Sequence, residues 1–130
     1  MRIVVLLSLL AACGATPPSL ADTSPAALVE QQAEAYNRRD LEAFLAPYSE
    51  DIELYEFPDK RHAVGKAAMR EGYKPLFEKY PKLHCESLNR IVMGNTVIVH
   101  ERVTGGPTVI EAVAIYTVKD GKISRLTLMQ

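Results

Sequence analysis

Residues 84–104 constrain the fold of this chain more strongly than any other stretch. Two runs of alternating, mainly β-branched residues flank a Gly94-Asn95 pair. A two-residue turn of this kind between such runs is a strong signal for a β-hairpin. With Gly94 and Asn95 as the turn, Arg90 is expected opposite Val99 and Leu88 opposite Glu101. One face of the predicted hairpin is then apolar except for a few ionisable groups; it carries Glu86, Leu88, Arg90, Val92, Val97, Val99, Glu101 and Val103.

The charged side chains among these valines are the first indication of chemistry. A carboxylate or guanidinium on a core-facing strand must be paired or must face a wet cavity. Arg90 and Glu101 lie diagonally across the predicted hairpin, within reach of one another. Two interpretations remain open: the pair belongs to a functional cavity, or this face is exposed to solvent and carries an ordinary ion pair.

Length and charge limit the possible classes of function. The 130 residues allow one domain with a modest core, and 15 basic residues balance 16 acidic ones. Such a balance argues against a nucleic acid or an anionic membrane surface as the partner. The sequence therefore predicts no nucleic-acid partner.

The first residues are typical of an export signal rather than of a folded domain. A basic Arg2 precedes an apolar run, 3–12, which is too short for a permanent transmembrane helix. Leu10-Ala11-Ala12-Cys13 resembles a bacterial lipobox, which predicts lipidation of Cys13 and a lipoprotein anchored at the membrane. The alternative is cleavage after Ser19-Leu20-Ala21, before Asp22, which gives a soluble periplasmic protein. Residues 1–24 are thus predicted to form a signal peptide and flexible tether, and residues 25–130 the domain.

The pattern of the remaining chain predicts helices first and a sheet afterwards. Ser24-Pro25 is a helix start, followed by apolar residues at three- and four-residue spacing. Pro75 is expected to kink or split the third helix. The predicted helices are 25–38, 41–46 and 66–80; the predicted strands are 52–57, the two arms of the hairpin, 108–119 and 123–129, with a loop at 60–64. This order indicates an α+β domain with helices on one side of a four- or five-stranded, mainly antiparallel sheet.

Several short motifs, in their order and spacing, resemble those of a known superfamily. They are Tyr36-Asn37-Arg38-Arg39-Asp40-Leu41, the strand 52–57, Gly65 at a helix start, Asn89-Arg90-Ile91-Val92 and the segment 114–123. Over residues 26–130 the chain is similar to SnoaL-like, nuclear-transport-factor-2-like proteins, the superfamily of ketosteroid isomerase. The resemblance implies a curved, mainly antiparallel sheet wrapped around the N-terminal helices, a cystatin-like α+β roll with a cone-shaped pocket. It also implies dimers through the outer face of the sheet, and members that isomerise, cyclise, hydrate, dehydrate or only bind small molecules.

The chemistry of ketosteroid isomerase does not carry over to this chain. The position of its tyrosine, which donates to the substrate oxygen, falls on Gln32. Its proton-shuttling aspartate falls on or next to Glu56, and the protonated aspartate of its oxyanion hole falls near Ala114, which has no side-chain donor. The resemblance therefore implies the fold and a pocket, but not a standard ketosteroid isomerase.

A different set of ionisable groups is left near the implied cavity. We predict Glu101 or Glu56 as the catalytic base and Arg90 as the group that stabilises a substrate anion. If the loop 105–107 brings Glu111 beside Glu101, two carboxylates in a low-dielectric pocket would raise one pKa. The alternative is a structural ion network of these residues, and a one-residue slip in register would move them all to the outer face. The predicted residues of the pocket are Tyr36, Tyr55, Tyr73, His84 and Glu111.

The cysteines and histidines add no further chemistry. Cys13 and Cys85 are the two cysteines, so no disulfide framework is predicted. Cys85 is expected on the face opposite Arg90, as a small half-buried hydrophobe rather than a catalytic thiol. The sequence has no zinc-binding, thiol-redox or phosphate-binding motif, so neither a metal nor a cofactor is predicted.

The sequence as a whole predicts an exported domain that binds a small, partly apolar organic molecule as a homodimer. One hypothesis is a cofactor-independent isomerase, cyclase or lyase that acts by proton transfer. The competing hypothesis is a non-catalytic ligand-binding or interaction domain of a lipoprotein. A cavity that contains an ionised carboxylate without a hydrogen-bonding partner favours the enzyme, whereas a filled cavity with Glu101 bound to Arg90 favours the binding domain.

Overall fold

The structure, a computed structural model, describes residues 22–130. The predicted signal sequence and Cys13 lie outside the described residues. Within the described range, no helix is long and apolar enough to cross a membrane. In chain order the elements are α1 (Pro25–Arg38), α2 (Leu41–Leu45), β1 (Tyr48–Glu56), β2 (Lys60–Val64), α3 (Lys66–Lys79), β3 (His84–Met93), β4 (Thr96–Thr104), β5 (Ile110–Lys119) and β6 (Lys122–Met129).

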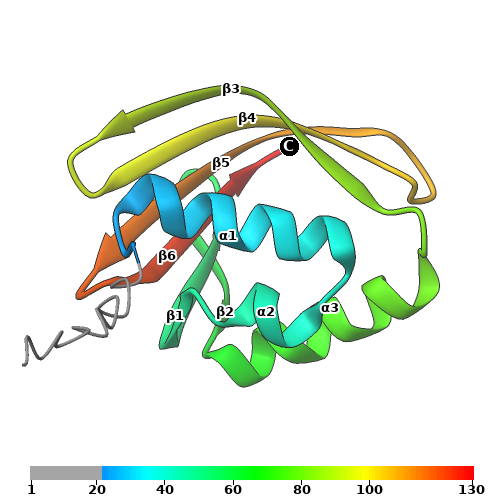
Figure 1. Cartoon of the computed structure of the whole chain (residues 1–130), viewed down its shortest axis with the longest axis horizontal. Coiled ribbons are helices and arrows are strands. Elements are labelled where there is room, and N and C mark those ends of the chain that lie inside the picture. The colour runs from blue at the N-terminus through cyan, green and yellow to red at the C-terminus, as the bar shows by residue number, and fades with distance from the viewer. Residues whose placement is uncertain (1–21) are drawn as a thin grey trace, which may run out of the picture.

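The first two helices meet at a tight, well-capped corner. The Ser24 side chain caps the start of α1. Arg39 ends α1 in the left-handed conformation, with φ of 55°, and its N–H donates to the carbonyls of Ala35 and Tyr36. Asp40 then caps α2 through the same kind of side-chain bond. The corner lays α2 close to the C-terminal end of α1 (Figure 1).

The six strands form one sheet in the order β2-β1-β6-β5-β4-β3. Neighbouring strands are antiparallel except β1 and β6, which are parallel. β5, which is apolar on both faces, is central as predicted. The expectation of a loop at 60–64 is wrong, because this segment is β2. It is an exposed edge strand that lacks the apolar alternation by which strands are recognised.

The third helix runs without interruption through Pro75. The predicted split is therefore wrong, whereas the alternative, a kink at Pro75, stays a prediction. Pro75 and Glu71 are both exposed, so the carbonyl that loses its N–H partner can face water. On the other side of α3, the buried Met69 and Phe77 pack into the core.

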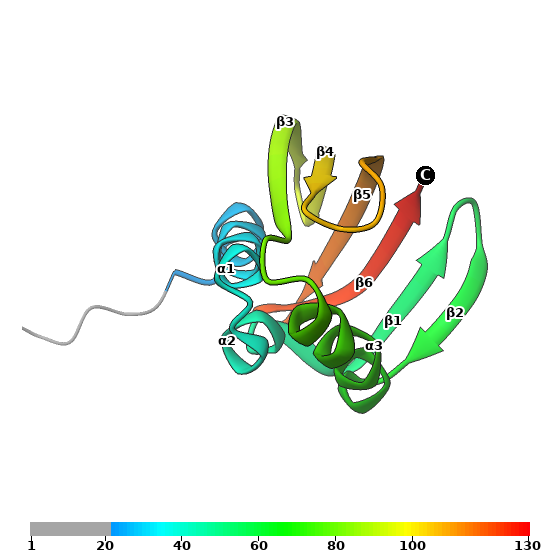
Figure 2. The same ribbon diagram turned by 90° about the vertical axis from the view of Figure 1, so that its right-hand side faces the viewer.

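The helices cover one face of the sheet, and the sheet curves around them (Figure 2). The core lies between these two layers and includes fully buried side chains such as Phe44, Ile52 and Val97. Burying one such side chain contributes about 1.5–3 kcal/mol. The predicted α+β class, with a curved and mainly antiparallel sheet wrapped around helices, is confirmed.

The predicted hairpin is present, with the expected partners near its turn and different ones further away. Arg90 pairs with Val99, as predicted. A β-bulge around Leu88 then shifts the register, so that Glu101 pairs with Ser87. The prediction that Glu101 pairs with Leu88 is wrong.

The shift changes which residues in the first half of β3 face the helices. Cys85 pairs with Val103 and shares the inner face with Glu101 and Arg90, so its predicted place on the opposite face is wrong. Glu86, predicted on the inner face, lies on the outer one. The extra residue at the bulge in β3 therefore places the Cys85 thiol on the same face of the sheet as the Glu101 carboxylate.

Candidate active site

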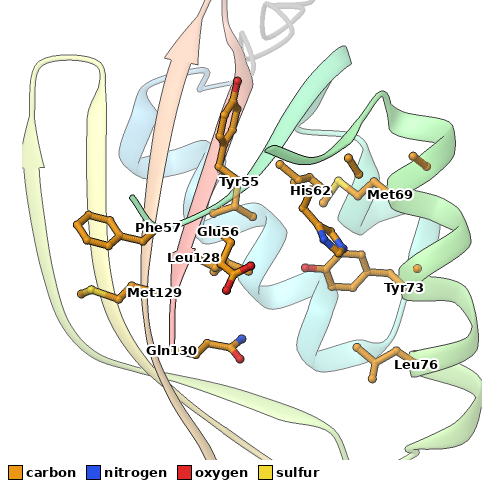
Figure 3. A pocket seen from close by; sticks show the side chains of 15 residues that line it. Tyr55, Glu56, Phe57, His62, Met69, Tyr73, Leu76, Leu128, Met129 and Gln130 are labelled. Atoms are coloured by element: carbon orange, nitrogen blue, oxygen red, sulfur yellow. The ribbon is translucent and has the colours of Figure 1, made fainter. Parts of the chain in front are cut away.

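Two neighbouring cavities, which share part of their walls, lie between the helices and the concave face of the sheet. The outer one, here called the mouth, has a volume of about 510 Å³ and opens between α3, the β1–β2 hairpin and the C-terminus. The inner one, the deep cavity, has a volume of about 190 Å³ and extends to α1 and the β4–β5 loop. Figure 3 shows Tyr73 and Leu76 reaching into the mouth from α3. The residues that line both cavities are Tyr73, Leu76, Leu126, Leu128 and Gln130.

Aromatic rings form much of the wall of the deep cavity. Tyr36 comes from α1, Phe44 from α2, Tyr48 from β1 and Tyr73 from α3. The ring centroids of Phe44 and Tyr73 are 4.7 Å apart, and those of Tyr36 and Phe44 are 5.8 Å apart. Contacts at these distances are favourable aromatic pairs and hold the rings in place. The wall therefore offers a preformed apolar surface to an organic ligand.

Glu101, in β4, is the one acidic residue that lines the deep cavity in the described part of the chain. The Cys85 thiol lies beside this carboxylate, and the two groups influence each other's pKa. Cys85 is held in turn by Asn37, whose amide donates to the Cys85 carbonyl at 3.0 Å and accepts from the Cys85 N–H at 2.7 Å. These two bonds tie the edge of β3 to α1 at the point where thiol and carboxylate meet.

Burial controls the protonation of this pair. Burial raises the pKa of Glu101 above its ordinary value, and the interaction with the Cys85 thiol offsets part of that rise. Burial and the nearby charge of Glu101 raise the pKa of the Cys85 thiol to about 12. Near neutral pH the thiol is therefore a protonated donor rather than a nucleophile. Glu101 is the member of the pair that can exchange a proton under those conditions, as a general base must.

Tyr36 and Tyr73, two of the predicted pocket residues, line the deep cavity, and neither hydroxyl forms a hydrogen bond within the described residues. Within the described residues, the tyrosine hydroxyls that form hydrogen bonds are those of Tyr48, Tyr55 and Tyr116. Burial raises the pKa of Tyr36 well above its ordinary value and that of Tyr73 to about 12. Both hydroxyls therefore keep their protons and can donate to a ligand oxygen.

Gln32 forms part of the cavity wall and belongs to a closed polar network. The Tyr48 hydroxyl donates to its side-chain oxygen at 3.1 Å. Its amide group donates to the Tyr116 hydroxyl at 3.1 Å and to the Val29 carbonyl at 3.0 Å. Gln32 is only 6% exposed, so these partners explain how a polar side chain interrupts the apolar face of α1.

The predicted partners of Glu101 bind elsewhere. The Arg90 guanidinium lies 3.3 Å from the carboxylate of Glu30 in α1, so its predicted pairing with Glu101 is wrong. Glu111 is exposed on the outer face, and Ala112 is the β5 residue that pairs with Glu101. The predicted pairing of Glu111 with Glu101 is therefore wrong, because Glu111 lies one residue away from the paired position and so faces the other side of the sheet.

The other predicted residues lie at the mouth or on the surface. Glu56 is exposed at the mouth, 3.6 Å from Lys60, and its carboxylate points into the mouth (Figure 3). Tyr55 borders the mouth, but its ring stacks against the Arg125 guanidinium at 3.7 Å. His84 is exposed on β3 and lines neither the mouth nor the deep cavity.

Three residues of the site escape prediction from the sequence. The face predicted for Cys85 is wrong because it depends on the bulge, for which the sequence near Cys85 gives no signal. Asn37 is a polar residue near the end of α1, and nothing near it in the sequence points to its partner, 48 positions away. Tyr116 could have been found by alternation, because it lies two residues from Ala114 on the inner face of the central strand.

The polar side chains that line the deep cavity are thus one carboxylate, one thiol, four phenols, the amides of Gln32 and Gln130 and the hydroxyl of Thr108. This set can accept a proton and donate hydrogen bonds to an oxygen of a ligand. In residues 22–130, no group of three His, Cys, Asp or Glu side chains is placed to hold a metal ion.

Comparisons with known proteins agree with the fold. Residues 29–126 match the family described as SnoaL-like domain. A comparison with curated proteins gives no significant match.

Three solved structures illustrate the similarity. A cystatin-fold protein from Novosphingobium aromaticivorans is 23% identical, with a TM-score of 0.76 over 82% of this chain and 98% of that one. A SnoaL-like protein of unknown function from Burkholderia thailandensis is 19% identical, with a TM-score of 0.69 over 80% of this chain and 91% of that one. A candidate polyketide cyclase from Pseudomonas putida is 24% identical, with a TM-score of 0.62 over 81% and 90%. These structures share the fold, and the family match covers most of the sequence: the chain belongs to the SnoaL-like domain family.

Proposed function

We propose that this protein is an enzyme that moves protons on a small, partly apolar organic molecule without a cofactor, as an isomerase, cyclase or lyase. The observation that carries the proposal is the carboxylate of Glu101 in an open, aromatic-walled cavity, where burial raises its pKa. Glu101 is the base. Because it is not paired with Arg90, its charge is available to a ligand.

The phenols of Tyr36 and Tyr73 take the role that Arg90 has in the sequence-based hypothesis. A base that removes a proton next to a carbonyl leaves negative charge on the carbonyl oxygen. Donors that already point into a dry cavity stabilise that charge without reorganising. The raised pKa values of both tyrosines keep the donor protons in place.

The size and lining of the cavities support a partly apolar substrate. The mouth is lined mainly by aliphatic side chains from α3, β1 and β6, while Glu56, His62 and Gln130 add polar groups. A ligand can therefore rest its apolar part in the mouth and present a polar end to Glu101. The candidate polyketide cyclase among the similar structures is consistent with such a ligand, but at 24% identity it supports the fold alone.

The test uses para-nitrophenol, whose phenolate resembles an enolate and absorbs visible light. A catalytic base holds the transferred proton while the enolate is bound, so the wild-type protein should take up about one proton as it binds the phenolate. Glu101→Gln imitates the protonated base and should bind the phenolate at least as tightly without proton uptake. Glu56→Gln, at the mouth, is the matched control and should behave like the wild type.

The competing function, a non-catalytic ligand-binding domain, gives a different result. Binding would then occur without proton uptake, and Glu101→Gln would leave both binding and proton balance unchanged. Failure of the wild-type protein to bind the phenolate would also contradict the proposed base.

We also propose that the protein forms a homodimer through the outer face of its sheet. A row of side chains crosses this face in register, from Tyr55 through Thr127, Ile115 and Ile98 to Ile91. Ile91 is 55% exposed, which is unusual for so apolar a residue in a strand and is consistent with a partner surface. Sedimentation equilibrium of the wild type and of Ile91→Lys tests this, since the variant should be monomeric.

Export is proposed from the sequence alone. Mass spectrometry of the mature N-terminus distinguishes its two forms. An acylated Cys13 means a lipoprotein, and a free Asp22 means a soluble periplasmic protein.

A further inference from the structure

A third cavity reaches Glu101 from the other side. It is a groove of about 280 Å³ between α1 and β3, here called the side groove. Glu101 and Cys85 line both the side groove and the deep cavity, together with Gln32, Ala33 and Tyr116. The carboxylate and its thiol partner therefore stand between the two spaces.

Two polar contacts between α1 and β3 lie at the two ends of the side groove. At one end, the Asn37 amide holds the backbone of Cys85 through two hydrogen bonds. At the other end, the Arg90 guanidinium meets the Glu30 carboxylate at 3.3 Å. The β-bulge around Leu88 lies between these contacts and interrupts the strand along the edge of the groove.

The side groove and the mouth differ in chemical character. The side groove carries an excess of acidic residues, because Glu30, Glu34, Glu86 and Glu101 line it together with one arginine, Arg90. The mouth is mainly aliphatic, and Glu56 is its one carboxylate among the described residues. An apolar ligand is favoured at the mouth, and water and cations are favoured in the groove.

From this geometry we infer that the side groove is a water and proton route to Glu101, separate from the path of the organic ligand. When a ligand fills the deep cavity and mouth, the base remains in contact with solvent through the groove. Protons reach it by way of the exposed carboxylates on the rim, and the Arg90–Glu30 ion pair bounds the opening. The purpose of the route rests on the proposed function, but its existence does not, because access to Glu101 can be measured without any reaction.

The test uses the Cys85 thiol as a reporter, since it touches Glu101 and lines the groove. In a Cys13→Ser background of the full chain, Cys85 is the remaining thiol. Its rate of modification by aminoethyl methanethiosulfonate, a small cation, is measured at one pH for all variants. Two plugs are compared: Ser87→Trp in the side groove, and Gly72→Trp in the mouth, where an added Cβ meets no atom within 4 Å.

The groove plug should slow modification by about tenfold, which corresponds to a barrier about 1.4 kcal/mol higher. The mouth plug should leave the rate within about twofold of the wild type. Glu34→Trp plugs the groove from α1 and replaces Ser87→Trp should that variant fail to fold. If the mouth plug slows the reaction and the groove plugs do not, or if no plug slows it, the route is not the side groove.

Charge gives a second, independent readout. The cationic reagent should react faster than its anionic counterpart, sulfonatoethyl methanethiosulfonate, because the groove is acidic. Removing two rim charges in Glu34→Gln/Glu86→Gln should reduce this preference, whereas Glu56→Gln at the mouth should not. The opposite pattern would overturn the inference. Neither result depends on para-nitrophenol binding, so the route and the proposed base can fail separately.

Discussion

Replacing Tyr48 by phenylalanine removes one hydroxyl from the wall of the deep cavity. Tyr48 is 1% exposed, and its hydroxyl donates to the side-chain oxygen of Gln32 at 3.1 Å. The other bonds of Gln32 use its amide hydrogens, so they cannot replace the lost donor. Tyr48→Phe therefore leaves a buried amide oxygen without a partner.

The expected cost follows from that unpaired acceptor. Leaving a buried polar group unsatisfied costs about 1–3 kcal/mol. With an unfolding entropy of about 2.1 cal/mol/K per residue over residues 22–130, each kcal/mol lowers the unfolding midpoint by about 4 °C. The midpoint of Tyr48→Phe should thus fall by about 4–13 °C.

Thermal unfolding followed by circular dichroism measures this change. Tyr80→Phe is the control, because Tyr80 is partly buried and its hydroxyl makes no hydrogen bond within the described residues; its midpoint should stay within about 2 °C. The double variant Tyr48→Phe/Gln32→Met removes donor and acceptor together and should lose less than the two single losses combined. A Tyr48→Phe midpoint equal to that of the wild type would refute the proposed network.

Three further predictions concern the site and its surroundings. Burial raises the pKa of Glu101, so the folded state holds that proton more tightly and loses stability as pH rises from 4.5 through the folded pKa. At about pH 8, Glu101→Gln should therefore melt at a higher temperature than the wild type, by about 6 °C for each unit by which the pKa of Glu101 is raised. At about pH 3 the two proteins should melt at the same temperature. A lower midpoint of the variant at about pH 8 would contradict the burial of this charge. Asn37→Ala should cost about 1–3 kcal/mol and speed exchange of the Cys85 amide hydrogen, and unchanged protection would show that the tie is unimportant. Gly105→Ala should destabilise by more than about 1 kcal/mol in urea unfolding, because its Cβ would lie 2.0 Å from the Lys82 carbonyl oxygen at a φ of 82°; wild-type stability would mean that this loop does not pack as described.

Local sequence signals account for most of the fold. The Gly94-Asn95 turn, the Ser24 cap and the apolar β5 act within a few residues, and each is present where predicted. The failures at β2 and at Pro75 have the same origin. Both segments are exposed, so solvent replaces the packing or hydrogen bonds on which sequence patterns depend.

The candidate site is less predictable because it depends on contacts between distant segments. Glu101 was identified from its charge on an apolar strand face, and it does line the cavity. Its partner was not: Arg90 forms an ion pair with Glu30 instead, and a single bulge in β3 places Cys85 beside Glu101. The bulge lies next to the bonds between Asn37 and Cys85, and no pattern within β3 encodes those bonds. A one-residue change of register is therefore enough to alter the chemistry of the site.

The central claim is that Glu101 is a desolvated carboxylate able to act as a base near neutral pH. The most direct test is a carboxyl NMR titration of the protein, with Glu101→Gln used to assign the resonance. We expect an apparent pKa for Glu101 clearly above its ordinary value of 4.5, moving further upward when Cys85→Ala removes the thiol. A pKa at or below 4.5 would mean that Glu101 is solvated or ion-paired, and it would contradict the proposed base.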